Sequence, residues 1–122
     1  MTQKNKELLL KDIYARIPYG VEGCCEGTTL RTTPSGWYAE YEVGYSINYM
    51  IIKSGWRPYL FPLSSMTEEQ SKIYHELIRG MFGTSALINF EALEDFFNKN
   101  HIDYRGLIPM GLALDATGLN IY

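Results

Sequence analysis

Cysteine is scarce in this sequence, and long apolar runs are missing. The two cysteines, Cys24 and Cys25, are neighbours, and neighbours rarely bond to each other because a disulfide needs Cα atoms about 4.4–6.8 Å apart. They also lack the C-x-x-C spacing of a metal site. The apolar run Leu8–Leu10 ends at a lysine, far short of the ~20 residues of a membrane span. The sequence therefore predicts a cytoplasmic protein with no membrane segment and no structural disulfide.

Basic residues are outnumbered by acidic ones. The chain has 11 Lys and Arg against 14 Asp and Glu, a net charge of −3, which disfavours a general affinity for nucleic-acid phosphates or anionic membranes. The excess lies in residues 63–122, which hold four basic and eight acidic residues, whereas residues 1–62 hold seven and six. This acidic half is predicted to be helical, so it forms either solvated helix faces or an acidic surface for a basic partner.

Catalytic and phosphate-binding motifs are missing as well. The glycines at 20, 23 and 27 are not followed by a lysine–serine pair or a helix start, which argues against a nucleoside triphosphatase. Thiolate catalysis needs a base within hydrogen-bond reach, and His75 and His101 are available without any local signature around the cysteines. His101 and Asp103 could share a metal ion, but two ligands do not make a site. We therefore predict a protein without metal or cofactor that is not an enzyme, with a Cys/His enzyme as the remoter alternative.

The composition is otherwise that of a globular protein. Apolar residues make up 46% of 122 residues, and we predict one domain over residues 1–122. Period-two alternation and short turns predict consecutive strands between residues 21 and 61. Gly23 weakens the first of them, and Pro58 either places the last at an edge of the sheet or shortens it. Because the turns are too short for parallel crossovers, the sheet is expected to be antiparallel.

A first helix is predicted over residues 6–17. Its apolar residues recur at three- and four-residue spacing, Asn5 is a suitable N-cap, and Pro18 ends the helix. Asp12 and Arg16 fall off its apolar stripe.

Two further helices are predicted in the second half. Thr67–Gln70 is a capping box that starts the first of them, and residues 90–100 form the other. The segment 85–89 either caps this last helix or forms a short strand, Asn100 is expected to close it in the left-handed conformation, and Asp103 is expected to cap a single helical turn. The expected buried residues are Ile73, Tyr74, Leu77, Ile78 and Met81 in one helix and Leu93, Phe96 and Phe97 in the other.

These elements predict an α+β fold. It consists of an antiparallel β-meander of three to five strands, with an N-terminal helix and two C-terminal helices packed mainly on one face.

Tyrosine is in excess, with 10 in 122 residues. Aromatic side chains on neighbouring strands pack in a core, form a protein interface or stack nucleobases, and few basic residues accompany them here. The arginines beside tyrosines either bind a carboxylate or phosphate, or tie a loop through its backbone carbonyls. The candidate binding residues are Tyr38, Tyr49, Trp56, Arg57, Tyr59, Asp103, Tyr104 and Arg105.

Four segments carry a resemblance to known sequences. They are Ala15–Gly20 (ARIPYG), Arg57–Glu69 (RPYLFPLSSMTEE), Asp103–Ile108 (DYRGLI) and Gly111–Leu114 (GLAL). They resemble an uncharacterised family of small proteins from gut Bacteroidetes, including Bacteroides, and their phages or mobile elements. The resemblance implies a phage or mobile-element setting and no particular activity.

The leading functional hypothesis is a small cytoplasmic binding module. It would act through a protein partner or through self-association. The alternative is a small-ligand or nucleotide-binding protein of phage–host conflict.

Overall fold

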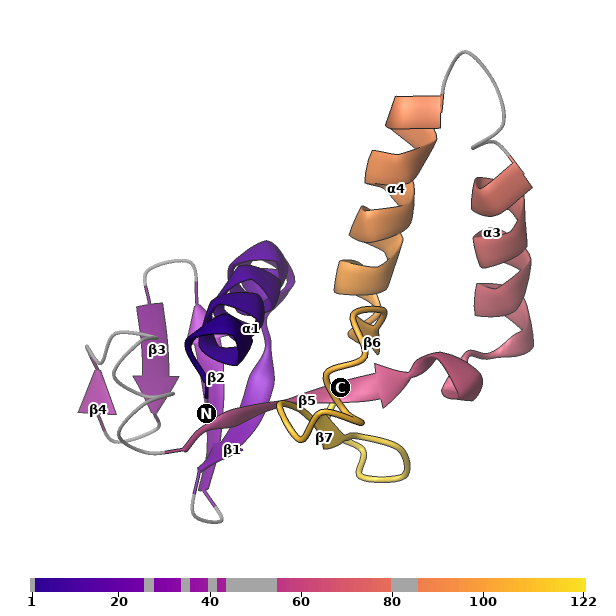
Figure 1. Cartoon of the computed structure of the whole chain (residues 1–122). Helices are drawn as coiled ribbons and strands as arrows, with labels where there is room; N and C mark the ends of the chain where they lie inside the picture. Colours follow the sequence, from indigo (N-terminus) through magenta and orange to yellow (C-terminus); the bar gives the residue numbers. More distant parts are fainter. Residues whose placement is uncertain (1, 26–27, 34–35, 40–41, 44–54, 80–85) are drawn as a thin grey trace.

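The computed structural model describes residues 2–25, 28–33, 36–39, 42–43, 55–79 and 86–122 (Figure 1). Within these residues lie the helices α1 (Gln3–Arg16), α3 (Glu68–Arg79) and α4 (Ala86–Lys99), and the short 3-10 helices η1 (Ile17–Tyr19) and η2 (Leu63–Ser65). The strands are β1 (Glu22–Cys25), β2 (Thr28–Thr33), β3 (Gly36–Ala39), β4 (Glu42–Val43), β5 (Arg57–Pro62), β6 (Ile102–Asp103) and β7 (Leu114–Asp115). Most strands precede the α3–α4 pair, which confirms the predicted α+β class.

The sheet is mixed. Its order is β4-β3-β2-β1-β5-β6, and β7 also pairs with β5. The strands β1 to β4 form the predicted antiparallel meander, and β5 is antiparallel to β1. However, β6 and β7 pair with β5 in parallel, so the prediction of a purely antiparallel sheet is wrong.

The parallel pairs arise from a long connection. Parallel neighbours need a crossover, and the chain from η2 through α4 provides one between β5 and β6. As a result β5 lies between β1 and β6. Pro58 is therefore in an interior strand, and its predicted position at an edge is wrong.

Helix α1 begins earlier than predicted because a different residue caps it. The Thr2 hydroxyl accepts a hydrogen bond from the backbone N–H of Asn5 at 3.1 Å. Asn5 is thus inside the helix, and its predicted role as the N-cap is wrong. The helix ends at Arg16, one residue before the predicted end, and the chain continues into η1, which contains Pro18.

The first hydrophobic core joins α1, the sheet and the C-terminal tail. Its buried members are Leu9, Ile13, Val21, Trp56, Leu60, Leu107, Leu112 and Ala113. Asp12 and Arg16 of α1 are also fully buried, although they lie off the apolar stripe of the helix. The buried face of α1 is therefore wider than its apolar residues indicate.

Gly23 in β1 makes room for this core. A Cβ atom at Gly23 would lie 2.1 Å from two ring carbons of Trp56 and 2.6 Å from the carbonyl oxygen of Arg57. No side chain fits at those distances without movement of its neighbours. Gly23 weakens the prediction of a strand here, but its lack of a side chain is what allows β1 to lie against the indole ring of Trp56.

Helices α3 and α4 form a hairpin that extends away from the sheet (Figure 1). The predicted capping box at the start of α3 is confirmed. The Thr67 hydroxyl accepts from the Gln70 N–H at 3.1 Å, and the Gln70 side-chain oxygen accepts from the Thr67 N–H at 3.0 Å. Helix α4 already begins at Ala86, so residues 86–89 are helical and do not form the alternative strand. His101, with φ 58°, takes the left-handed position predicted for Asn100.

The second hydrophobic core lies within this hairpin. Its buried residues are Leu93, Phe96, Phe97 and Ile102, and the three from α4 are those predicted. By contrast, no residue of α3 is buried. The prediction of a buried stripe on α3 is wrong: Tyr74, Leu77 and Ile78 are half-buried, Ile73 is 41% exposed, and Met81 lies outside the described residues.

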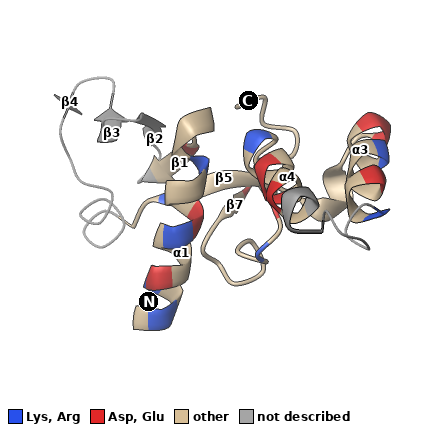
Figure 2. Ribbon diagram, turned by 90° about the horizontal axis from the view of Figure 1, so that it is seen from above, with Lys and Arg blue, Asp and Glu red and all other residues tan. Residues whose placement is uncertain are grey.

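The hairpin does not share one face of the sheet with α1. Helix α3 packs on α4, and α4 packs on β6 and α1. Seen from above, α3 lies far from the sheet, with α4 between it and α1 (Figure 2). The prediction that the helices pack mainly on one face is therefore wrong, because α3 packs chiefly on α4 and extends away from the sheet (Figure 1).

Candidate functional site

The predicted binding residues of the sheet do not form one surface among the described residues. Tyr49 lies outside the described residues, and Tyr38 is described only by its backbone, which pairs with β2 and β4. Trp56 is fully buried in the first core. Arg57 donates to the carbonyl oxygen of Trp56 at 2.8 Å, which is the backbone-tying alternative considered for the loop arginines. A binding role for the aromatic side chains of Tyr38 and Tyr49 stays a prediction.

Tyr59 lies beside Cys24 of the neighbouring strand β1. A hydrogen bond between its hydroxyl and the thiol is the main reason that the pKa of Tyr59 is raised above its usual value. The Tyr122 hydroxyl reaches the same two strands: it donates to the carbonyl oxygen of Tyr59 at 2.8 Å and accepts from the Glu22 N–H at 2.9 Å. These contacts fasten the C-terminal tail across β1 and β5.

A buried ionic cluster connects α1 to the tail. The Asp12 carboxylate accepts from Arg16 Nε at 2.8 Å and from Arg105 Nε at 3.1 Å. Arg16 also donates to the carbonyl oxygens of Ile102 at 2.7 Å and Phe97 at 3.4 Å. Asp12 and Arg16 are fully buried, so the guanidinium groups depend on this one carboxylate and on the carbonyls for their stabilisation.

Tyr104 extends the cluster with its ring. The ring stacks on Phe97, with centroids 4.9 Å apart and planes 15° apart. The guanidinium of Arg105 lies 4.7 Å from the ring centroid and also donates to the Tyr104 hydroxyl at 2.7 Å. Burial raises the pKa of the Tyr104 hydroxyl, which stays protonated at neutral pH. The structure thus brings Tyr104 and Arg105 together in an internal network.

Asp103 also has an internal task. Its two carboxylate oxygens accept from the N–H groups of Leu107 and Ile108 at 2.9 and 2.8 Å, and the residue is only 5% exposed. Asp103 therefore caps the turn that follows it, although that turn begins later than the sequence predicts.

His101 is held in an unusual position at the end of α4. Its ring stacks on Tyr122 with centroids 3.6 Å apart, and its buried Nδ1 atom has no hydrogen-bond partner among the described residues. Burial, and to a smaller extent the charge of Arg16, lower the pKa of His101 to about 4. The imidazole is therefore neutral at neutral pH.

This histidine predicts a dependence of stability on pH. The unfolded chain protonates His101 near its usual pKa of 6.5, whereas the folded chain does so only near 4. Between these values the unfolded state binds more protons, so stability is full above pH 6.5 and falls as the pH is lowered toward 4. We expect urea unfolding to show a larger loss between pH 7 and pH 5 for the wild type than for His101→Asn. Asparagine tolerates the left-handed backbone, and equal losses in the two proteins would contradict this origin.

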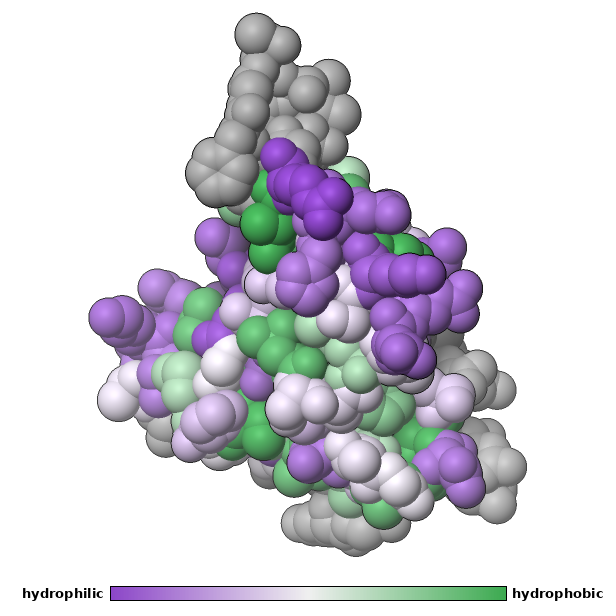
Figure 3. Space-filling model, turned by 90° about the vertical axis from the view of Figure 1, so that its right-hand side faces the viewer, coloured by the Kyte–Doolittle hydropathy of each residue, from purple (hydrophilic) through white to green (hydrophobic). Residues whose placement is uncertain are grey.

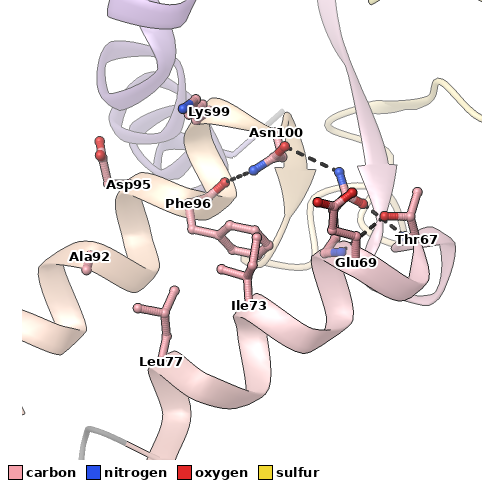
Figure 4. Close-up of a pocket in the computed structure, with 10 residues that line it drawn as sticks. Thr67, Glu69, Ile73, Leu77, Ala92, Asp95, Phe96, Lys99 and Asn100 are labelled. Atoms are coloured by element: carbon pink, nitrogen blue, oxygen red, sulfur yellow. Dashed lines mark hydrogen bonds between the residues drawn. The ribbon is translucent and has the colours of Figure 1, made fainter.

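A groove of about 520 Å³ lies between α3 and α4 (Figure 4). Ile73 and Leu77 from α3 and Ala92 and Phe96 from α4 form its apolar part. The close-up shows the side chains of Ile73, Leu77 and Phe96 converging between the helices. The half-exposed stripe of α3 therefore forms one wall of an open apolar groove.

Polar residues surround this apolar part. At one end the Gln70 amide donates to the Asn100 side-chain oxygen at 3.3 Å, and the Asn100 amide donates to the carbonyl oxygen of Phe96 at 2.8 Å (Figure 4). Charged side chains line the rim, namely Glu69, Asp95 and Lys99. An apolar centre with a polar rim is the usual make-up of a protein-binding surface.

The rim also contacts the first part of the chain. The Tyr19 hydroxyl of η1 donates a hydrogen bond to Asp95. This bond, more than desolvation or the charge of Asp95, raises the pKa of Tyr19 above its usual value. The α4 wall of the groove is thereby bonded to η1, which directly follows α1.

The groove was missed by reasoning from the sequence. Apolar residues at positions 73, 74, 77 and 78 predict a buried stripe, and periodicity cannot show how much of it a partner helix covers. One signal for the groove is present in the sequence of α4. The expected inward residues of this helix are large, whereas Ala92, which lines the groove, is small. A small residue facing an apolar stripe leaves space between two helices.

Comparisons with known proteins find no match for this chain among protein-family models, curated proteins or solved structures. The resemblance to a Bacteroidetes family stays a prediction. Over the described residues, no three His, Cys, Asp or Glu side chains are grouped so that they could hold a metal ion. No helix in the same part of the chain has the length and apolarity to cross a bilayer.

Proposed function

We propose that the protein is a non-catalytic binding module that engages a protein partner through the groove between α3 and α4. The observation that carries this proposal is the incomplete burial of α3. Its apolar stripe is paired with α4 on one side only, and Ile73 remains 41% exposed. An apolar surface left open in this way gains free energy when a partner covers it.

Several of the other candidate residues make contacts inside the fold, which leaves the groove as the better candidate for a binding surface. Asp103, Tyr104 and Arg105 are used within the fold, and Trp56 is in the core. The groove, in contrast, presents apolar side chains beside charged ones. In the space-filling view, hydrophobic residues are exposed among hydrophilic ones on this side of the molecule (Figure 3). This arrangement favours the groove, rather than the predicted binding residues such as Arg105, as the surface that contacts a partner.

The lining of the groove favours a polypeptide over a nucleotide. It carries the carboxylates of Glu69 and Asp95 and a single ammonium group, that of Lys99. Two carboxylates repel a phosphate, and one exposed lysine does not form a phosphate site. The nucleotide-binding alternative therefore receives no support from this groove.

Site-specific photo-crosslinking in cells of the source organism tests the proposal. A photoreactive residue at position 99, on the rim, should give a discrete protein adduct, whereas one at position 14, where Tyr14 is 60% exposed on α1, should not. The adduct should disappear when Ala92→Gln fills the groove, since glutamine keeps the helix and adds volume without charge. Equal adducts from both positions, no adduct, or an adduct that survives Ala92→Gln would contradict the proposal.

A further inference from the structure

We infer that the occupant of the groove is a basic amphipathic α-helix, lying along α3 and α4 as a third helix; this inference rests on the proposed function. It depends on three properties of the hairpin: the spacing of the apolar side chains, the absence of unpaired backbone in the helical walls, and the net charge of the two helices.

The spacing matches a helix. Ile73 and Leu77 are four residues apart on α3, and Ala92 and Phe96 are four residues apart on α4. Each pair occupies successive turns of one helix face. Such ridges accept side chains that recur every three to four residues on a partner helix, which packs at about 8–10 Å from each wall.

An extended partner has little to bind here. A strand gains affinity from backbone hydrogen bonds with the open edge of a sheet. The walls of the groove are helices, whose interior backbone groups are already bonded along the helix. Side-chain contact is therefore the main source of affinity, and a helix presents side chains at the matching spacing.

The charge of the hairpin selects a basic partner. Over the described residues of α3 and α4 there are six acidic side chains and three basic ones, a net charge of −3. Acidic and basic residues are interspersed along the α3 ribbon (Figure 2), and Glu69 and Asp95 lie at the groove itself. A second copy docked hairpin to hairpin would bring the same excess of negative charge to the interface, which costs affinity.

Synthetic helices test this inference on the full 122-residue chain. The first peptide carries leucines at positions i, i+4, i+7 and i+11 with flanking lysines; a second has glutamates in place of the lysines; a third has the first composition in an order that destroys the stripe. Fluorescence anisotropy should show binding of the lysine peptide at least tenfold tighter than that of the other two. Its affinity should fall as salt rises, because exposed charges are screened.

Variants of the chain assign the binding to the groove. Ala92→Gln should weaken the lysine peptide at least tenfold, and Glu69→Lys should weaken it about threefold. Glu7→Lys, an equal change of charge on the exposed side of α1, should leave it unchanged. Circular dichroism and urea unfolding verify that each variant folds.

The possible failures are distinct. Equal binding of the lysine and glutamate peptides, unaltered binding to Ala92→Gln, or no binding of any peptide while position 99 still yields its groove-dependent adduct would overturn the basic helix and leave the proposed function standing. Loss of that adduct would overturn the proposed function itself.

Discussion

Replacing Asp12 with asparagine should lower the free energy of unfolding by about 3–5 kcal/mol, the usual result of removing one member of a buried ion pair. The carboxylate of Asp12 is the shared acceptor of Arg16 and Arg105. Without its charge, the fully buried guanidinium of Arg16 keeps only uncharged partners among the described residues, namely carbonyl oxygens and the ring of Tyr104. The predicted loss is thus the penalty of an uncompensated charge and exceeds the energy of a single hydrogen bond.

Urea unfolding followed by circular dichroism measures this change. Glu7→Gln is the matched control, because it neutralises an exposed acid on the same helix whose side chain accepts a hydrogen bond from Gln3; it should change stability by less than about 0.5 kcal/mol. If Asp12→Asn does not fold at all, Arg105→Gln provides a milder version, since it leaves the Asp12–Arg16 pair intact. A loss below about 1 kcal/mol for Asp12→Asn would show that the cluster does not depend on this charge.

Gly23→Ala should destabilise the fold by roughly 1–3 kcal/mol or more, the range for overpacking a core. The added methyl group would lie 2.1 Å from ring atoms of Trp56 and 2.6 Å from a carbonyl oxygen of β5. The ring belongs to a fully buried residue, and the carbonyl belongs to the backbone, so neither yields easily. Either β1 separates from β5 or the indole leaves its position in the core.

A double-mutant cycle identifies the clash as the cause. Trp56→Leu alone should be destabilising because it leaves a cavity, but it removes the ring atoms that the new methyl group meets. The loss caused by Gly23→Ala should therefore be smaller in the Trp56→Leu background than in the wild type. Gly118→Ala serves as a contrast without a clash. Gly118 has a positive φ of 77°, but a Cβ atom added there would meet no described atom within 4 Å. Additive losses in the cycle would mean that strain elsewhere, rather than contact with the indole, makes Gly23 necessary.

Local features of the fold could be predicted from the sequence. The capping box at Thr67 depends on two side chains three residues apart, and the end of α1 before Pro18 depends on the proline itself, which has no N–H to continue the helical hydrogen bonds. The inward residues of α4 follow from the period of a helix. In each case the chemistry and its partner lie within one or two turns of the chain.

Features that depend on distant residues could not be predicted. The pairing of β5 with β6 and β7 requires the chain to return after two helices, and no periodicity records such a return. For the same reason Asp12 and Arg16 look like an exposed pair on a helix. They are buried because Tyr104, Arg105 and the carbonyl of Ile102 come back to cover them.

The candidate site shows the same limit. The acidic character of the second half of the chain was visible in composition, and the hairpin carries it. Which of its apolar residues remain open depends on how far α3 is covered by α4, and that is settled by packing. Tyr104 and Arg105 were identified as a pair by their position next to each other, but their partner Asp12 is 93 residues away.

The mixed sheet has a consequence for the growing chain. Tyr59 in β5 pairs with Leu114, and Leu60 pairs with Asp115, so the middle strand receives its last neighbour 55 positions later. While the ribosome is still adding the intervening residues, β5 has an open edge. Contacts between such distant residues form slowly because the intervening loop must close first. The sheet can therefore be completed only after residue 115 has left the exit tunnel, and until then the open edge of β5 is available for pairing with other chains.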